Sequence, residues 1–320
     1  MEILEQGQGQ LIQPVDIDGL RAWNRAKTKA LVDKRMSEAQ AVSRFVHNGI
    51  YLGVELYGMV RCPLSLIAEI IRQGISDLRV AGQGVLELDM LLAAGRVRAM
   101  DISYAGLEAY GLSACLRREI ESGRLEQCVE WSNAALAWRL KAAAMGVPFL
   151  PARSMLSTDT LRHSAAVVVT DPFSDTPVCL LPALILDVGL IHVHRADQYG
   201  NAQIDGISGY AAELARASKT LIISAEEIVE TEHIRQQPDR TIIPYYLVDA
   251  VVPAPFGAHP GEMSGFYRRD EAQIRAWVQA AKTAEGAQAY LQEYIFNLEG
   301  HQPYLEKIGR AKLEELRSGC

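Results

Sequence analysis

The chain has 320 residues, of which 49% are hydrophobic and 22% are charged. This composition is typical of a globular protein with an ample core and excludes a disordered chain. The formal net charge is −7, and no run of Lys or Arg offers a stripe for phosphate groups. We therefore expect no nucleic-acid partner.

Cysteine and histidine spacing argues against a metal or disulfide framework. The five cysteines lie far apart without a C-x-x-C pair, and the histidines show no ligand spacing. The start, MEILEQGQGQ, lacks the apolar core of a signal peptide. The longest apolar stretch, 178–193, contains Pro182 and Asp187, so it is not expected to span a membrane. The expected location is the cytoplasm.

The first half of the chain alternates between helical and strand patterns after a polar start. Residues 1–35 are weakly periodic and are predicted to form an N-terminal extension that ends in a helix. Ser37 and Gln40 have the spacing of a capping box, and Gly74 is placed to end a helix. The predicted helices are 37–49, 63–74, 86–95, 112–123 and 133–146, and the predicted strands are 50–56, 78–84, 97–106 and 125–132. Such alternation predicts crossover units around a parallel sheet.

The second half carries longer strand patterns and a helical end. Strands are predicted at 165–171, 177–184, 186–197, 220–228 and 245–259, with one helix at 210–219. From Asp270 onward, aromatic residues recur at helical spacing. We therefore predict an α/β fold with an open, mostly parallel sheet flanked by helices and a helical C-terminal tail. Residues 36–320 are expected to form a single domain.

No self-contained catalytic motif is present. The stretch AGQGVLE lacks the third glycine of a dinucleotide fingerprint, and the chain has no Walker A, G-x-S-x-G or H-E-x-x-H sequence. Four other stretches draw attention. Two are strand-to-helix loops, 52–63 and 80–89, whose glycines would let backbone N–H groups approach a ligand, although a tight turn is the simpler reading.

The other two stretches mix polar groups into apolar surroundings. Ser132 and Asn133 open a predicted helix, where Ser132 serves as an N-cap whether or not the amide faces a ligand. The stretch 180–206 carries His192 and His194 on one face of a strand. A histidine in such a strand is more often a satisfied structural group than a catalytic one.

These stretches, taken in order, resemble the α subunits of the family I CoA-transferases, especially the glutaconate type. The sequence that carries the resemblance is DPFSDTPVCLLPALILDVGLIHVHRADQYGNAQIDG, followed downstream by AEEIVETEHIRQQPDRTIIPYYLVDAVVPAPFGAHPGEMSGFY. Upstream support comes from EIIRQGISDL, LDMLLAAGRV and AAAMGVPFLP. The resemblance extends from about residue 32 to the C-terminus.

The resemblance implies covalent catalysis by a carboxylate on another chain. In this family a glutamate of the β subunit, within an S-E-N-G-type sequence, attacks the acyl-CoA, and this chain contains no E-N-G. No catalytic residue is therefore expected here, and no permanently bound cofactor, because the CoA thioester is the substrate. The implied partner is a β subunit in an α2β2 or α4β4 assembly, with an acyl-CoA and a glutaconate-like carboxylic acid as substrates.

The resemblance also implies substrate-binding residues at the ends of the strands. Relatives have a second glycine and an aromatic residue after Gly53, where this chain has Val54 and Glu55. Glu55 is either a new group in the cleft or, more simply, a solvated surface glutamate. Arg153 suits a substrate carboxylate, with an ion pair at a helix edge as the alternative. The candidate residues are Gly53, Val54, Glu55, Tyr57, Gly82, Gln83, Gly84, Tyr104, Ser132, Asn133, Arg153 and Ser157.

Two other functions stay open on this scaffold. Relatives include hydrolases that open a ring of a steroid-derived CoA thioester, and decarboxylases of glutaconyl-type CoA esters. The ring-opening group is expected to carry an acid near the position of Asn133, and the amide found here favours transfer, since it cannot accept a proton as a base does. A metabolite-sensing module without catalysis is the remaining alternative. It is disfavoured because residues 1–35 offer no helix-turn-helix.

Overall fold

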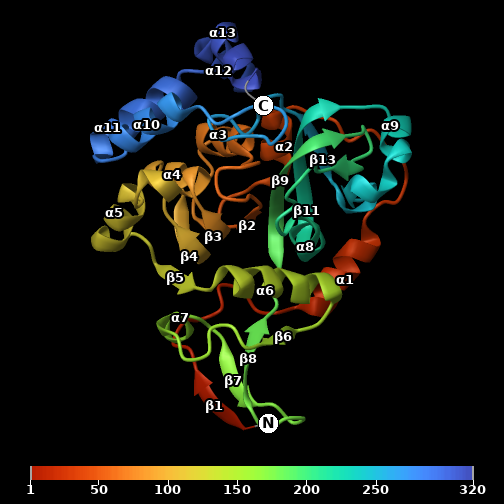
Figure 1. The fold of residues 1–320 in the computed structure, drawn as a ribbon, viewed down its shortest axis with the longest axis vertical. Helices are drawn as coiled ribbons and strands as arrows, with labels where there is room; N and C mark the ends of the chain where they lie inside the picture. Colours follow the sequence, from red (N-terminus) through yellow and green to blue (C-terminus); the bar gives the residue numbers. More distant parts are fainter. Residues whose placement is uncertain (1, 319–320) are drawn as a thin grey trace.

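A nine-stranded, mostly parallel sheet forms the centre of the molecule in a computed structural model that describes residues 2–318 (Figure 1). Seven strands run parallel: β2 (Tyr51–Val54), β3 (Leu78–Gly84), β4 (Val97–Ala105), β5 (Gln127–Glu130), β9 (Leu186–Ala196), β11 (Ser218–Ile228) and β13 (Ala250–Pro253). The short strands β10 (Ala202–Gln203) and β12 (Thr241–Ile243) join antiparallel to β9 and to each other. The predicted sheet type is confirmed.

Helices cover both faces of this sheet, as the alternating pattern predicts. They are α2 (Glu38–Phe45), α3 (Leu64–Arg72), α4 (Leu86–Ala93), α5 (Ala114–Ser122), α6 (Asn133–Met145) and α8 (Ala211–Ala217), with the short α7 (Asp159–Arg162) and α9 (Thr231–Gln236) in connections. The capping box of Ser37 and Gln40 is present. In the described chain, no helix is both long and apolar enough to cross a bilayer.

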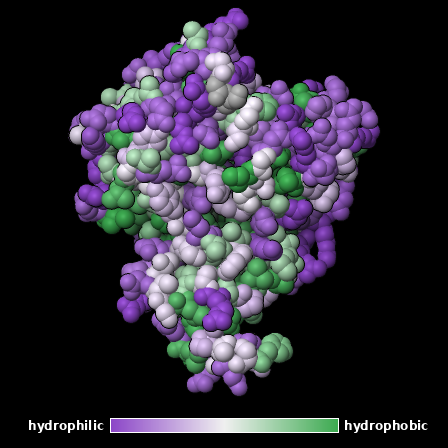
Figure 2. Space-filling view, viewed as in Figure 1, coloured by the Kyte–Doolittle hydropathy of each residue, from purple (hydrophilic) through white to green (hydrophobic). Residues whose placement is uncertain are grey.

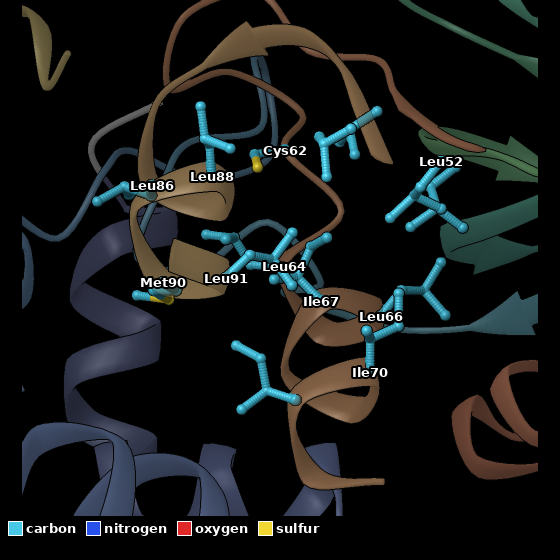
Figure 3. Close-up of a cluster of buried hydrophobic side chains, with 14 of the residues drawn as sticks. Leu52, Cys62, Leu64, Leu66, Ile67, Ile70, Leu86, Leu88, Met90 and Leu91 are labelled. Atoms are coloured by element: carbon cyan, nitrogen blue, oxygen red, sulfur yellow. The ribbon is translucent and has the colours of Figure 1, made fainter. Parts of the chain in front are cut away.

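Alternate side chains of each strand enter two separate cores. Leu52 and Val80 belong to one cluster together with residues of α3 and α4, whereas Tyr51 and Ala81 belong to the cluster on the other face. Figure 3 shows Leu52 of the first cluster with labelled residues of both helices. A strand covered by helices on both sides is buried on both of its faces, which is why β2 is a continuous apolar run and most of β9 is buried, including the polar residues His192 and His194. The two cores, one on each face of the sheet, thereby fix the position of the sheet edge where the strands have their carboxyl ends.

A second, four-stranded antiparallel sheet was not predicted. Its order is β1 (Ile3–Gln6), β7 (Val167–Thr170), β8 (Pro177–Pro182) and β6 (Phe149–Ala152). Figure 1 shows it at the lower end of the molecule, with the N-terminus at its tip. Residues 1–35, read from the sequence as an extension, thus supply an edge strand here, and their helix α1 (Ile17–Ala26) ends well before residue 35.

Exposed apolar side chains accompany the small sheet. Ile3, Leu4 and Phe149 are partly exposed, and Phe173, in the β7–β8 turn, is 96% exposed. Figure 2 shows apolar residues in green toward the lower end of this face, whereas the upper part of the face is mostly polar.

The predicted helical C-terminal tail is confirmed. It comprises α10 (Glu271–Ala280), α11 (Ala284–Leu291), a π-helical turn (Gln292–Phe296), α12 (His301–Ile308) and α13 (Arg310–Arg317). Trp277 and Tyr290 meet edge to face at 5.0 Å between ring centroids. The strand predicted at 245–259 is much shorter, because residues 245–247 form a 3-10 turn and the chain turns again after Pro253.

Candidate active site

An open cavity of about 420 Å³ lies where β2, β3, β4 and β5 end. The carboxyl ends of parallel strands meet at one edge of a sheet, and this edge is the usual place for ligands in open α/β folds. Each lining residue lies in the last two residues of one of these strands or within four residues after it. The lining residues are Tyr57, Gly58, Gln83, Val85, Tyr104, Glu108 and Asn133. Four of them, Tyr57, Gln83, Tyr104 and Asn133, were predicted from the sequence.

Aromatic and neutral polar groups dominate the walls of the cavity. Tyr57 is 49% exposed and Tyr104 40% exposed, so their rings are available to a ligand. Gln83 accepts a hydrogen bond from Gly58 N at 3.4 Å, and Asn133 is the first residue of α6. Amide and hydroxyl groups of this kind orient a polar ligand without adding charge.

Glu108 is the one charged residue of this lining. It lies in a short 3-10 turn after β4 with a φ of +50°, and its N–H donates to the Tyr104 hydroxyl at 3.1 Å. A Cβ built on Gly58 would meet Glu108 Oε1 at 2.2 Å, so the carboxylate rests against bare backbone. Strained backbone of this kind in a non-glycine residue clusters at functional sites.

Glu55 is neither solvated nor in the cavity, which corrects the simpler expectation for this residue. Glu55 and Arg61 are both fully buried. The guanidinium of Arg61 donates from Nη1 and Nη2 to the two carboxylate oxygens at 2.7 and 2.9 Å. It also donates to the carbonyl oxygens of His192 at 3.3 Å and Ile207 at 3.2 Å. A paired, hydrogen-bonded arrangement is what allows both charges to be buried.

A second buried carboxyl group, Glu87, lies beside the cavity wall at the start of α4. Val85 N donates to both of its oxygens at 3.2 Å, and the Cys62 thiol lies 3.5 Å from Oε2. Burial raises the pKa of Glu87 to about 7, although the hydrogen bonds from the backbone oppose this shift. The group fixes the turn between β3 and α4.

Several predicted residues have structural positions outside the cavity lining. Gly53 and Gly84 leave room for Leu186 and Leu88, whose side-chain atoms would lie 2.2 Å from an added Cβ. Gly82 similarly faces the carbonyl oxygen of Val54, itself a buried strand residue. These three glycines therefore make room for neighbouring groups of the protein itself rather than for a ligand.

The polar candidates near α6 and β6 also lie apart from the lining. Ser132 caps α6, with Ala135 N donating to its hydroxyl at 3.1 Å. Arg153 is exposed on the loop after β6, where it forms no ion pair with any residue between 2 and 318. Ser157, on the same loop, has a φ of +59°.

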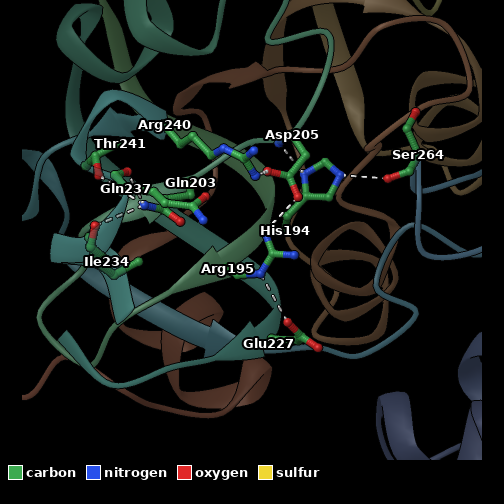
Figure 4. Close-up of polar contacts among 10 residues, drawn as sticks. All are labelled: His194, Arg195, Gln203, Asp205, Glu227, Ile234, Gln237, Arg240, Thr241 and Ser264. Atoms are coloured by element: carbon green, nitrogen blue, oxygen red, sulfur yellow. Dashed lines mark hydrogen bonds and ion pairs between the residues drawn. The ribbon is translucent and has the colours of Figure 1, made fainter. Parts of the chain in front are cut away.

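The two histidines of β9 are satisfied structural groups, as the simpler reading predicted. His192 contacts Ser224 Oγ and Glu226 Oε1, both at 2.8 Å. His194 receives a hydrogen bond from Asp205 N at 3.1 Å and contacts the Ser264 carbonyl oxygen at 2.9 Å (Figure 4). Burial lowers the pKa of His194, which keeps the ring neutral.

Sequence reasoning missed Glu108, whereas Gly58 and Val85 lie in the two predicted ligand loops, 52–63 and 80–89, without being among the candidate residues. The signal for Glu108 was available, because a carboxylate three residues beyond a strand that ends at Ala105 reaches the same sheet edge as the predicted residues. The contact between Glu108 and Gly58 could not be predicted from the sequence, because it joins the loops after β4 and β2, which lie close together only through the order of the strands in the sheet.

The fold and this cavity define an open α/β protein with its ligand site at the carboxyl edge of the sheet. The family model "Coenzyme A transferase" matches residues 35–254. The crystal structure of glutaconate coenzyme A-transferase from Acidaminococcus fermentans superposes with a TM-score of 0.85 at 31% identity, covering 89% of this chain and 95% of that chain. The chain thus belongs to the coenzyme A transferase family, as a family I α subunit, and its substrate is a CoA thioester.

Individual relatives differ in their named activities, and one of them is uncharacterized. A glutaconate CoA-transferase subunit of Acidaminococcus fermentans is 33% identical over 305 residues, which are 89% of this chain and 95% of the relative. An uncharacterized protein of Archaeoglobus fulgidus is 48% identical over 99% of this chain and 72% of its own length. A cholesterol ring-cleaving hydrolase subunit of Rhodococcus jostii is 30% identical over 82% of this chain and 92% of its length.

Proposed function

We propose that this chain is the α subunit of a heteromeric enzyme that moves coenzyme A from an acyl-CoA to a carboxylic acid. A β subunit would supply the nucleophilic glutamate. The observation that carries the proposal is the open cavity at the carboxyl ends of β2 to β5, lined by hydroxyl and amide groups. A cavity that is open on one side in this way is consistent with a binding cleft whose other wall is formed by a second chain.

The proposed reaction proceeds through two covalent states of the partner. Its glutamate carboxylate attacks the thioester carbonyl, which forms an acyl-glutamyl anhydride and releases the CoA thiolate. The thiolate attacks the glutamyl carbonyl, which releases the first acid as a carboxylate and leaves a glutamyl-CoA thioester. The second acid then repeats these steps in reverse order. Covalent catalysis divides one slow exchange into faster steps.

This chain would bind and orient the acyl group in that scheme. Hydroxyl groups of Tyr57 and Tyr104 and the amides of Gln83 and Asn133 line the cavity. Donors of this type stabilise negative charge that develops on a thioester carbonyl oxygen. The remaining predicted residues, including Gly53 and Arg153, are proposed to act only by shaping the loops or the rim.

The test uses this chain purified together with the product of a neighbouring gene. After incubation with an acyl-CoA and rapid denaturation, intact-mass spectrometry should find a CoA adduct on the partner and none on this chain. Borohydride should reduce that thioester, and peptide mapping should place it on a glutamate. An adduct on Glu108 of this chain, or turnover without any adduct, would contradict the proposed division of labour.

Hydrolysis of a carbon–carbon bond is the second candidate, because a relative is named as a ring-cleaving hydrolase. Such a reaction needs a base to activate water, and the position that opens α6 holds Asn133, whose amide is not a base. Release of a ring-opened product with no exchange of CoA between acids would favour this candidate. The same mass-spectrometric sample distinguishes the two.

A further inference from the structure

We infer that the cavity selects a monocarboxylic acid with an uncharged, preferably aromatic, acyl group and rejects acids that carry a second carboxylate. This inference rests on the proposed function and defines the substrate class of the same cavity. It departs from the glutaconate-like acid that the family resemblance implies. The reasons are the sign of the charge in the cavity and the nature of its walls.

The cavity contains a carboxylate and, among residues 2–318, no basic side chain lines it. Glu108 has a side chain that is 36% exposed, so its charge faces the space that a ligand would occupy. A second carboxylate of a bound acid would therefore meet a like charge. Like charges a few ångströms apart in partly buried surroundings repel strongly enough to lower affinity about tenfold.

The nearest arginines do not reverse this sign. Arg61 is buried and held by both oxygens of Glu55. Arg269 Nη1 lies 3.9 Å from Glu108 Oε2, but its Nε lies 3.0 Å from Glu262 Oε2. Arg269 thus stands between two carboxylates, and the three charges together leave a net charge of about −1.

The position of Glu108 is built into the fold rather than left to a mobile surface side chain. Its backbone has a φ of +50° and is held by hydrogen bonds from Glu108 N to Tyr104 and from Gly111 N to the Glu108 carbonyl oxygen. Its carboxylate fits against Gly58, where any side chain would collide with it. Backbone strain persists only where the surrounding structure enforces it.

Beside the neutral amides, the walls offer two aromatic rings on which a flat acyl group can pack. Tyr57 and Tyr104 expose their rings to the cavity, whereas the lining residue Val85 is almost fully buried and offers little surface. Aromatic side chains contribute large contact areas and bind other rings in offset or edge-to-face geometry. The volume of about 420 Å³ exceeds the roughly 150 Å³ that accommodates a benzene ring, so an aryl group fits.

The test compares acids that differ only by a second carboxylate. Phenylacetate is paired with 4-carboxyphenylacetate, and hexanoate with adipate, as acceptors for the complex of this chain with its partner. We expect kcat/KM to favour the monocarboxylate of each pair by about tenfold or more. Glu108→Gln should narrow that ratio, and Glu108→Arg should reverse it. Glu285→Gln, on the exposed face of α11, is the matched control that should leave the ratio unchanged.

A binding measurement separates this inference from the proposed function. The same four acids are titrated against the complex by calorimetry, with the wild type and the Glu108 variants. If no acid accepts CoA but the binding ratios follow Glu108 as expected, transfer is refuted and the charge selection stands. If the wild type prefers the dicarboxylates, or if Glu108→Gln leaves both ratios unchanged, the inference is overturned.

Discussion

The buried pair of Glu55 and Arg61 gives a prediction whose size follows from the structure. Glu55→Gln leaves the guanidinium of Arg61 fully buried without an anionic partner. Removing one partner of such a pair typically costs about 3–5 kcal/mol. An unfolding entropy of about 2.1 cal/mol/K per residue amounts to roughly 0.7 kcal/mol/K for 320 residues, so Tm should fall by about 4–7 °C.

Differential scanning calorimetry of the purified complex measures this shift. The matched control is Glu126→Gln, which breaks an exposed ion pair with Arg98 (58% and 55% side-chain exposure) and should cost at most about 1 kcal/mol. The double variant Glu55→Met with Arg61→Met should be more stable than either single variant, because no unpaired charge remains. Equal Tm losses for Glu55→Gln and Glu126→Gln would refute the reasoning, as would a double variant less stable than both singles.

Three further predictions concern the loops and the sheets. Gly58→Ala should displace the Glu108 carboxylate that packs against Gly58 and lower kcat/KM several-fold. The control is Gly74→Ala, which introduces similar backbone strain at a φ of +75° but has open space around it. This control should lower the stability of the protein without changing kcat/KM. The free energy of unfolding of the wild type, compared with that of Glu87→Gln, should fall by about 3 kcal/mol as the pH rises from 4 to 8. The reason is that burial raises the pKa of this carboxyl group to about 7, so the folded protein loses the Glu87 proton at a higher pH than the unfolded chain does. Urea denaturation of both proteins at each pH measures the difference. Deleting residues 2–6 should raise hydrogen exchange in β7 while β2 and β3 keep their protection; unchanged exchange in β7 would contradict the pairing of β1.

The sequence predicted those features that local patterns determine. The helix at 133–145 was readable from Ser132, which caps it, and from Gly146, which ends it in a left-handed conformation. The parallel sheet was readable because its strands alternate with helices. The cavity residues Tyr57, Gln83, Tyr104 and Asn133 were among the candidates that the family resemblance implied, and they lie at the carboxyl edge where ligands bind in such sheets.

Features that depend on distant partners were not readable. The small sheet pairs Ile3 with Val169, and no pattern in residues 1–10 reveals a partner that far along the chain. The burial of Glu55 depends on Arg61, which reaches it through a backbone with a φ of +59° that sequence does not predict for arginine. A glutamate in a loop is usually solvated, but here the ion pair with Arg61 allows Glu55 to be buried.

The order of strands in the large sheet has a consequence for how the chain acquires its structure during synthesis. β9 pairs with β2 on one side and β11 on the other, although about 130 residues separate β2 from β9. Strands β2 to β5 therefore leave the ribosome while one edge of β2 is still unpaired. This edge stays exposed until β9 has been synthesised and pairs with it. Exposed strand edges in such intermediates invite wrong pairing. Production of this protein should thus benefit more from slow translation or chaperones than its final stability alone would suggest.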